Sequence, residues 1–196
     1  MTGFKSHYIA ANGIRIHYLR EGRGPALLLL HGWPEFCRVW RKCIPALSAE
    51  FDVIAPDLRG FGDTEKPAHG PSADAGAEVH GADILALMDG LGLERVGIVS
   101  HDVGAYAAQW LAHQHPDRLR GLFFFNCPYA GIGARWAVPE HLKEIWYQSS
   151  ISSPGPPGWS GARARPAGSI SAISSGIGRM IRKRSTRTWT RGSTTS

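Results

Sequence analysis

Residues 99–104, Val-Ser-His-Asp-Val-Gly, are the stretch that decides the fold of this chain. A short apolar run at residues 96–99 leads into them, and residues 105–112, Ala-Tyr-Ala-Ala-Gln-Trp-Leu-Ala, follow. The apolar run is typical of a strand, and the segment that follows is typical of a helix. The sequence therefore predicts a strand, an abrupt turn and a helix.

An abrupt turn of this kind lifts one side chain above the ends of the strands, and the residues two before and two after it must be small. With Asp102 at the centre, these residues are Ser100 and Gly104, and both are small. With Ser100 at the centre, they are Ile98 and Asp102, and neither fits. If the turn presents a nucleophile, that nucleophile is a carboxylate and not a serine hydroxyl.

The formal net charge of +6 is not spread evenly along the 196 residues. Residues 1–149 hold 14 Lys and Arg against 16 Asp and Glu, whereas residues 150–196 hold 8 Lys and Arg and no acid. The first part therefore has the near-neutral composition of an enzyme, and we expect no nucleic acid as its partner.

Cysteine usage and hydropathy indicate the compartment. The 3 cysteines fit neither a CxxC pair nor a disulfide framework, so we expect reduced thiols. The first residues contain no apolar signal core, and no apolar run approaches the length that spans a membrane. We expect a cytoplasmic protein with no membrane partner.

Strand and helix signals alternate along the chain. Strands are predicted at residues 8–11, 14–19, 26–30, 51–55, 96–99 and 119–126, the first two joined by a tight turn. Apolar side chains at helical spacing predict helices around residues 40–47, 84–91 and 105–112. This alternation predicts an α/β fold, with a mostly parallel sheet and helices on both faces.

Three polar residues, His31, Asp57 and Asp102, come directly after predicted strands. Ligands bind at the carboxyl ends of the strands in parallel sheets. Each residue alone could equally serve a loop hydrogen bond, but three at one edge of a sheet favour a site.

The motifs around these residues are His31-Gly-Trp-Pro34, Asp57-Leu-Arg-Gly-Phe-Gly-Asp63 and the turn centred on Asp102. In this order and spacing they resemble the α/β-hydrolase fold over about residues 5–149, and more narrowly its epoxide hydrolase and haloalkane dehalogenase branch. The resemblance implies that residues 1–132 are the N-terminal portion of the α/β-hydrolase core, and that residues 133–149 start a helical cap.

The resemblance also implies a mechanism. The Asp102 carboxylate, at a helix N-terminus that favours an anion, attacks an electrophilic carbon and forms an alkyl ester. Water activated by a histidine then hydrolyses the ester, while the backbone amides of Trp33 and Val103 form the oxyanion hole. The Trp33–Pro34 bond would be cis. The motif residues that would support these groups are His31, Gly32, Pro34, Ser100, His101 and Gly104.

The substrate implied is a small molecule that reacts with water, and no cofactor or metal is implied. Dehalogenases that resemble this chain place Trp or Arg directly after the nucleophile, where this chain has Val103. Epoxide hydrolases instead use a cap tyrosine as the acid, and Tyr147 is the candidate because Tyr147-Gln148 resembles that motif. Glu35 after the His-Gly-Trp-Pro motif also favours an epoxide hydrolase, with a haloalkane or haloacid dehalogenase as the alternative.

In this fold the triad runs nucleophile, acid and histidine along the chain. The acids and histidines that follow Asp102 are Asp117, Glu140, Glu144, His113, His115 and His141. Three of them fall near the end of the helix after Asp102, roughly 15 Å from its start. We therefore expect a chain that is truncated relative to the family and that alkylates Asp102 at most once.

Residues 150–196 form a basic low-complexity tail without Leu, Val, Phe, Tyr, Asp or Glu, and we expect it to be disordered. It could be a linker, a tail that binds a partner, or an out-of-frame product. Codons can be chosen for which a one-base shift restores acids, leucines and aromatic residues, so we favour a frameshift near codon 149 or 150. The alternative to an enzyme is a non-catalytic fragment whose basic tail binds RNA or an acidic membrane.

Overall fold

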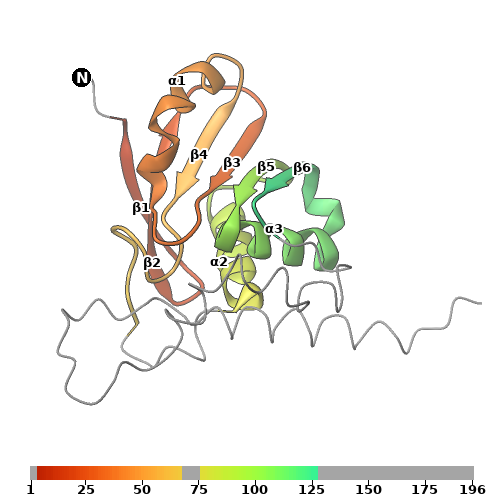
Figure 1. Ribbon diagram of the computed structural model, residues 1–196. Coiled ribbons are helices and arrows are strands. Elements are labelled where there is room, and N and C mark those ends of the chain that lie inside the picture. Colours follow the sequence, from red (N-terminus) through yellow and green to blue (C-terminus); the bar gives the residue numbers. More distant parts are fainter. Residues whose placement is uncertain (1–3, 68–75, 128–196) are drawn as a thin grey trace, which may run out of the picture.

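A six-stranded sheet lies at the centre of the computed structural model, which describes residues 4–67 and 76–127 (Figure 1). The strands are β1 (Ser6–Ala11), β2 (Ile14–Glu21), β3 (Ala26–Leu30), β4 (Asp52–Pro56), β5 (Val96–His101) and β6 (Leu119–Phe125). The helices are α1 (Ile44–Leu47), α2 (Ala77–Gly90) and α3 (Asp102–Gln114), with 3-10 turns η1 (Cys37–Lys42) and η2 (Pro116–Arg118). The predicted cap at residues 133–149 and the tail at residues 150–196 lie outside the described residues.

The strands are arranged in the order β1-β2-β4-β3-β5-β6. β4, β3, β5 and β6 run parallel, and the β1-β2 hairpin adds two antiparallel strands beside β4. The hairpin turns through Asn12 and Gly13, which both have positive φ, as the tight turn predicted there requires. The predicted α/β class with a mostly parallel sheet is confirmed.

The sheet buries apolar side chains on both faces because successive residues of a strand point to opposite sides. One face packs against α2 and α3, and its core includes Ile16, Tyr18, Leu28, Leu30, Leu87, Met88 and Leu111. The other face packs against η1 and α1, and its core includes Leu27, Leu29, Trp40, Ile44 and Val53. β3 therefore lies at the centre of the fold, with Leu28, Leu29 and Leu30 completely buried.

One local prediction was wrong. The helix predicted around residues 40–47 is divided into η1 and the single turn α1, because Pro45 has no amide hydrogen and fits only the first turn of a helix. The strand at the end of the described chain, β6, has the apolar composition of a buried strand, but Phe123 and Phe125 are 62% and 45% exposed. Among the described helices, none has the length and apolar character needed to cross a membrane.

Candidate active site

Asp102 is the first residue of α3 and comes directly after β5, so the strand becomes a helix within one residue. Its φ of +48° lies in the left-handed region, which costs a non-glycine residue about 1–3 kcal/mol. Surrounding contacts must hold this conformation. The strand, abrupt turn and helix predicted from residues 96–112 are present, and Asp102 is the residue at which the chain turns.

Small residues surround the turn because the loop after β3 lies against it. A Cβ atom at Gly104 would lie 2.6 Å from the carbonyl oxygen of His31, and a Cβ atom at Gly32 would lie 2.7 Å from the Cβ of Asp102. Ser100 is completely buried at the end of β5. The amide of Gly104 also donates a hydrogen bond to the His31 carbonyl at 3.0 Å. Larger side chains at these positions would separate the loop from the turn.

The Asp102 carboxylate contacts the same loop. The amide of Trp33 donates a hydrogen bond to Oδ1 of Asp102 at 2.8 Å, and the Trp33–Pro34 bond is cis, as expected. Val103 follows in the first turn of α3, where amide groups have no acceptor within the helix. Oδ1 is therefore held by a backbone donor, and the helix N-terminus stabilises the negative charge of the carboxylate.

His101, the residue before the turn, is held among aromatic rings. Its ring stacks on Phe125 at a centroid distance of 5.2 Å and meets the edge of Trp40 at 5.6 Å. Its Nε2 lies 2.9 Å from Oε2 of Glu35, which is within ion-pair distance but is not aligned as a hydrogen bond. The sequence placed Glu35 in a motif but did not predict this pairing, because Glu35 lies in the loop after β3 whereas His101 ends β5.

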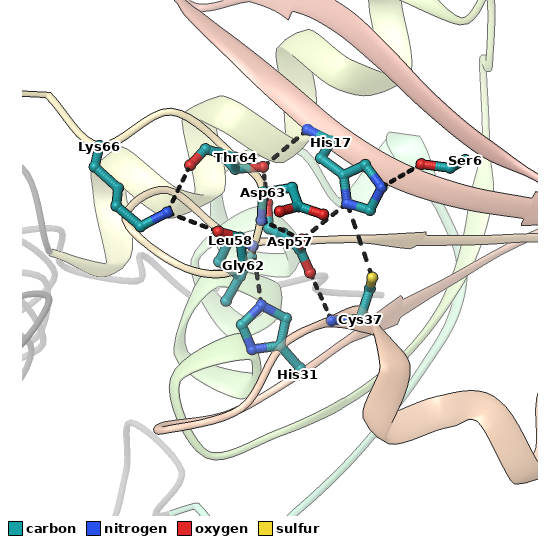
Figure 2. Close-up of polar contacts among 10 residues, drawn as sticks. All are labelled: Ser6, His17, His31, Cys37, Asp57, Leu58, Gly62, Asp63, Thr64 and Lys66. Atoms are coloured by element: carbon teal, nitrogen blue, oxygen red, sulfur yellow. Dashed lines mark hydrogen bonds and ion pairs between the residues drawn. The ribbon is translucent and has the colours of Figure 1, made fainter.

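His31 positions the loop and is not available as a base. Its Nδ1 donates to the carbonyl oxygen of Gly32 at 2.8 Å. Its Nε2 accepts from the amide of Leu58 at 2.9 Å (Figure 2). Burial lowers the pKa of His31, so the ring is neutral at pH 7. Both ring nitrogens are occupied by these two hydrogen bonds. His31 fixes the Gly32 and Trp33 segment against the end of β4.

Asp57 is at the predicted strand end but does not face Asp102. Its Oδ1 accepts from the amide of Cys37 at 2.6 Å, and its Oδ2 accepts from the amide of Asp63 and from Nδ1 of His17, both at 2.8 Å (Figure 2). Burial opposes its ionisation, but these hydrogen bonds outweigh that effect and lower the pKa of Asp57. For Asp57 the loop hydrogen-bond alternative is correct.

One group in the described part of the chain has the chemistry of a metal site. A His17 nitrogen, the Cys37 sulfur and an Asp57 oxygen lie within 4.8 Å of one another, and all three residues are buried. However, Nδ1 of His17 is 2.8 Å from Oδ2 of Asp57, whereas two ligands of a tetrahedral zinc ion lie about 3.3 Å apart. The spacing fits a hydrogen bond and not a shared ion.

Tyr106 and Cys127 lie close to Asp102 and were not singled out from the sequence. Burial, with Cys127 and Asp102 adding to it, raises the pKa of Tyr106 well above its ordinary value. Burial also raises the pKa of Cys127 to about 12. Tyr106 is four residues after Asp102, so helical spacing could have placed the two on one face of α3. Both groups are neutral near pH 7 and add no charge beside the carboxylate.

The late acid and base candidates that fall within the described residues are not brought to Asp102. His113, His115 and Asp117 lie at the opposite end of α3, and His113 is roughly 17 Å from Asp102 at the rise of an α-helix. The predicted acid Tyr147 lies outside the described residues. The structure therefore brings together Asp102, the Trp33 amide, Gly32 and Gly104.

The family model of the alpha/beta hydrolase fold matches residues 25–146. The soluble epoxide hydrolase of Corynebacterium sp. (strain C12) is 42% identical over 125 residues, which are 64% of this chain and 42% of that protein. A fluoroacetate dehalogenase of Burkholderia sp. is 36% identical over 121 residues, which are 61% of this chain and 40% of that protein.

The crystal structure of an epoxide hydrolase from Vigna radiata superposes with a TM-score of 0.67 at 32% identity, over 78% of this chain and 50% of that one. The chain therefore spans half or less of the length of these relatives. The family model covers more than half of the chain, and the relatives include epoxide hydrolases. By its sequence and its sheet, this chain belongs to the α/β-hydrolase fold family and is similar to epoxide hydrolases.

Proposed function

We propose that this chain opens epoxides with the Asp102 carboxylate as the nucleophile. The observation that carries the proposal is the geometry of the turn, in which Asp102 has a φ of +48° at the N-terminus of α3 and its Oδ1 accepts from the Trp33 amide. With Oδ1 held, Oδ2 is the oxygen that attacks the epoxide carbon. A C–O bond of the ring breaks, and an alkyl ester of Asp102 and an alkoxide form.

The alkoxide must take up a proton, and Tyr147 is the proposed acid, from the likeness of Tyr147-Gln148 to the epoxide hydrolase motif. When water attacks the ester, negative charge develops on Oδ1. The Trp33 amide is already within 2.8 Å of that atom, and the Val103 amide follows in the first turn of the helix. These two donors are the proposed oxyanion hole.

An epoxide is favoured over an organohalide by the residue after the nucleophile. A departing halide ion needs N–H donors, and the aliphatic side chain of Val103 supplies none. A fluoroacetate dehalogenase is nevertheless among the relatives, so an organohalide is the second candidate substrate. The two substrates differ in the mass of the ester they leave on Asp102, because only the organohalide loses an atom.

Hydrolysis of the ester requires a base, and three of the described histidines are unsuited to that role. His31 has both ring nitrogens in hydrogen bonds, and His113 and His115 lie at the far end of α3. We therefore expect this chain to form the ester on Asp102 and to retain it.

Intact-mass spectrometry of the 196-residue chain after incubation with styrene oxide tests the proposal. We expect one adduct with the full mass of the epoxide, and peptide mapping should place it on Asp102. Asp102→Asn should abolish the adduct, and Asp117→Asn should retain it. An adduct with fluoroacetate but none with the epoxide would favour the organohalide. Equal modification of several carboxylates would overturn Asp102 as the nucleophile, and sustained diol formation would overturn the single turnover.

A further inference from the structure

A second chain of polar groups lies outside the Asp102 site and joins β1, β2 and the end of β4. Ser6 Oγ is 2.6 Å from Nε2 of His17, and Nδ1 of the same ring is 2.8 Å from Oδ2 of Asp57 (Figure 2). The hydroxyl and the carboxylate therefore contact opposite nitrogens of one imidazole. This is the hydrogen-bond order of a serine nucleophile, a general base and the acid that orients it.

The partners of Asp57 determine where the protons lie. Its carboxylate accepts from the amides of Cys37 and Asp63, and the lowered pKa of Asp57 means that it is ionised near neutral pH. An ionised carboxylate only accepts, so Nδ1 of His17 carries the hydrogen. In the neutral imidazole Nε2 is then the acceptor, and the hydroxyl of Ser6 donates to it. The Ser6 hydroxyl is thus aligned to lose its proton to His17.

The register of the sheet explains this alignment. β1 and β2 are antiparallel, with Tyr8 opposite His17 and Ser6 opposite Leu19. Ser6 is therefore the diagonal neighbour of His17 on the same face, within reach of a side chain. His17 is 3% exposed, whereas Ser6 is exposed, so the hydroxyl meets solvent and the base lies behind it.

The backbone at Ser6 offers a donor on the same strand. Arg20 donates its amide to the carbonyl of Lys5 at 3.1 Å, so the two residues occupy a bonded position of the ladder, although the Lys5 amide itself donates to Oε1 of Glu21. Bonded and non-bonded pairs alternate in an antiparallel ladder, so Ser6 and Leu19 are a non-bonded pair. The amide of Ser6 is therefore directed away from β2, at the edge of the described sheet. A donor there can stabilise charge that develops next to the hydroxyl.

We propose that Ser6 is an activated serine that accepts acyl or phosphonyl groups from electrophilic esters, independently of Asp102. With an acyl ester, Ser6 Oγ forms a bond to the acyl carbon, its proton passes to Nε2 of His17, and the bond to the alcohol breaks. The leaving alkoxide then takes the proton from His17. With a fluorophosphonate, Oγ bonds to phosphorus and fluoride leaves, while the proton remains on His17 until solvent removes it.

The test is labelling of the full chain with a fluorophosphonate probe at pH 7.5, followed by peptide mass spectrometry. Ser48 is the internal control, because among the described residues its hydroxyl donates only to the carbonyl of Pro45. We expect Ser6 to react about 100-fold faster than Ser48, the size of a general-base effect. This difference should vanish when the chain is unfolded in urea. Equal labelling of the two serines in the folded chain would overturn the proposal.

Variants separate activation from simple accessibility. Ser6→Ala should remove the adduct, and His17→Gln should slow labelling by about 100-fold. Because a buried variant at His17 can unfold the chain, Ser6→Cys and Ser48→Cys provide a second comparison by iodoacetamide alkylation. Faster alkylation at position 6 supports the assigned base, and equal rates contradict it. Asp102→Asn should leave labelling of Ser6 unchanged, so failure of the epoxide proposal would not affect this one.

Discussion

Gly104 is a residue at which the fold leaves no room for a side chain. A Cβ there would lie 2.6 Å from the His31 carbonyl oxygen, a backbone atom that cannot rotate away. We predict that Gly104→Ala lowers the free energy of unfolding by about 1–3 kcal/mol, the usual cost of overpacking. Urea unfolding followed by circular dichroism measures this change.

Gly121→Ala is the matched control because nothing lies within 4 Å of a Cβ at that position of β6. Its unfolding free energy should stay within about 1 kcal/mol of that of the parent chain, with any change toward greater stability. A loss at Gly121 as large as that at Gly104 would show that crowding beside the turn is not the cause.

Contacts between residues close in sequence could be predicted, and contacts between distant residues could not. Ser100 and Gly104 indicated the turn at Asp102 because the size limit acts over two residues on either side. The pairing of His17 with Asp57 spans 40 residues and depends on the register of β2 beside β4. No local pattern carries that register, so Asp57 was placed correctly at a strand end and assigned to the wrong surroundings.

α2 and α3 pack against each other through a glycine of α2. A Cβ at Gly81 would overlap the indole ring of Trp110 in α3. We predict that Gly81→Ala separates the two helices and lowers the free energy of unfolding by about 1–3 kcal/mol, even though alanine favours a helix. Thermal unfolding followed by circular dichroism tests this.

Gly90→Ala in the same helix is the control, because a Cβ there meets the terminal Cδ1 of Ile9, the end of a flexible side chain. It should be neutral or stabilising by up to about 1 kcal/mol. If neither variant changed the stability of the fold, the contact between α2 and α3 would be less close than it is in the structure.

The spacing of apolar residues predicted which side chains are buried more reliably than it predicted the extent of each helix. Trp40 and Ile44 are buried, as their spacing predicted. The two residues nevertheless belong to η1 and α1, because Pro45 forces a new start. β5 likewise extends two residues beyond the apolar run, to His101, since backbone pairing with β6 continues through polar residues.

Buried histidines make the stability of the whole fold depend on pH. His80 is 2% exposed, and burial, with Arg59 and His31 nearby, lowers its pKa to about 4. An unfolded histidine binds a proton near pH 6.5. Between pH 6.5 and 4 the unfolded chain therefore holds more protons than the folded chain, and the free energy of unfolding decreases as the pH is lowered. Burial lowers the pKa of His31 in the same direction.

We predict that the free energy of unfolding falls by roughly 3 kcal/mol for His80 alone between pH 7 and 4. Asp57, whose pKa is lowered, adds a further loss below about pH 4. Urea unfolding at several pH values gives the slope. His80→Gln should flatten it, and His113→Gln, at an exposed position, should not. An unchanged slope in His80→Gln would contradict the assignment.

The molecule also presents apolar side chains at the β6 side of the described sheet. Phe123 and Phe125 are 62% and 45% exposed, and an apolar edge strand promotes pairing between chains. We predict that the chain is poorly soluble and self-associates, and that Phe123→Lys reduces the association. Sedimentation velocity of both proteins tests this, and Tyr8→Lys on β1 is the control. A parent chain that is a monodisperse monomer would contradict the prediction.

The hydrogen bond between the Trp33 amide and Asp102 joins residues 69 positions apart in sequence. It can form only after β3 and β5 have paired, which is among the slower events of folding because a long loop must close first. If Asp102 captures an electrophile as proposed, that reaction is a chemical clock for the closing of the sheet. If labelling of Asp102 is quenched at successive times during refolding, the time at which the adduct first forms gives the time at which β3 and β5 pair.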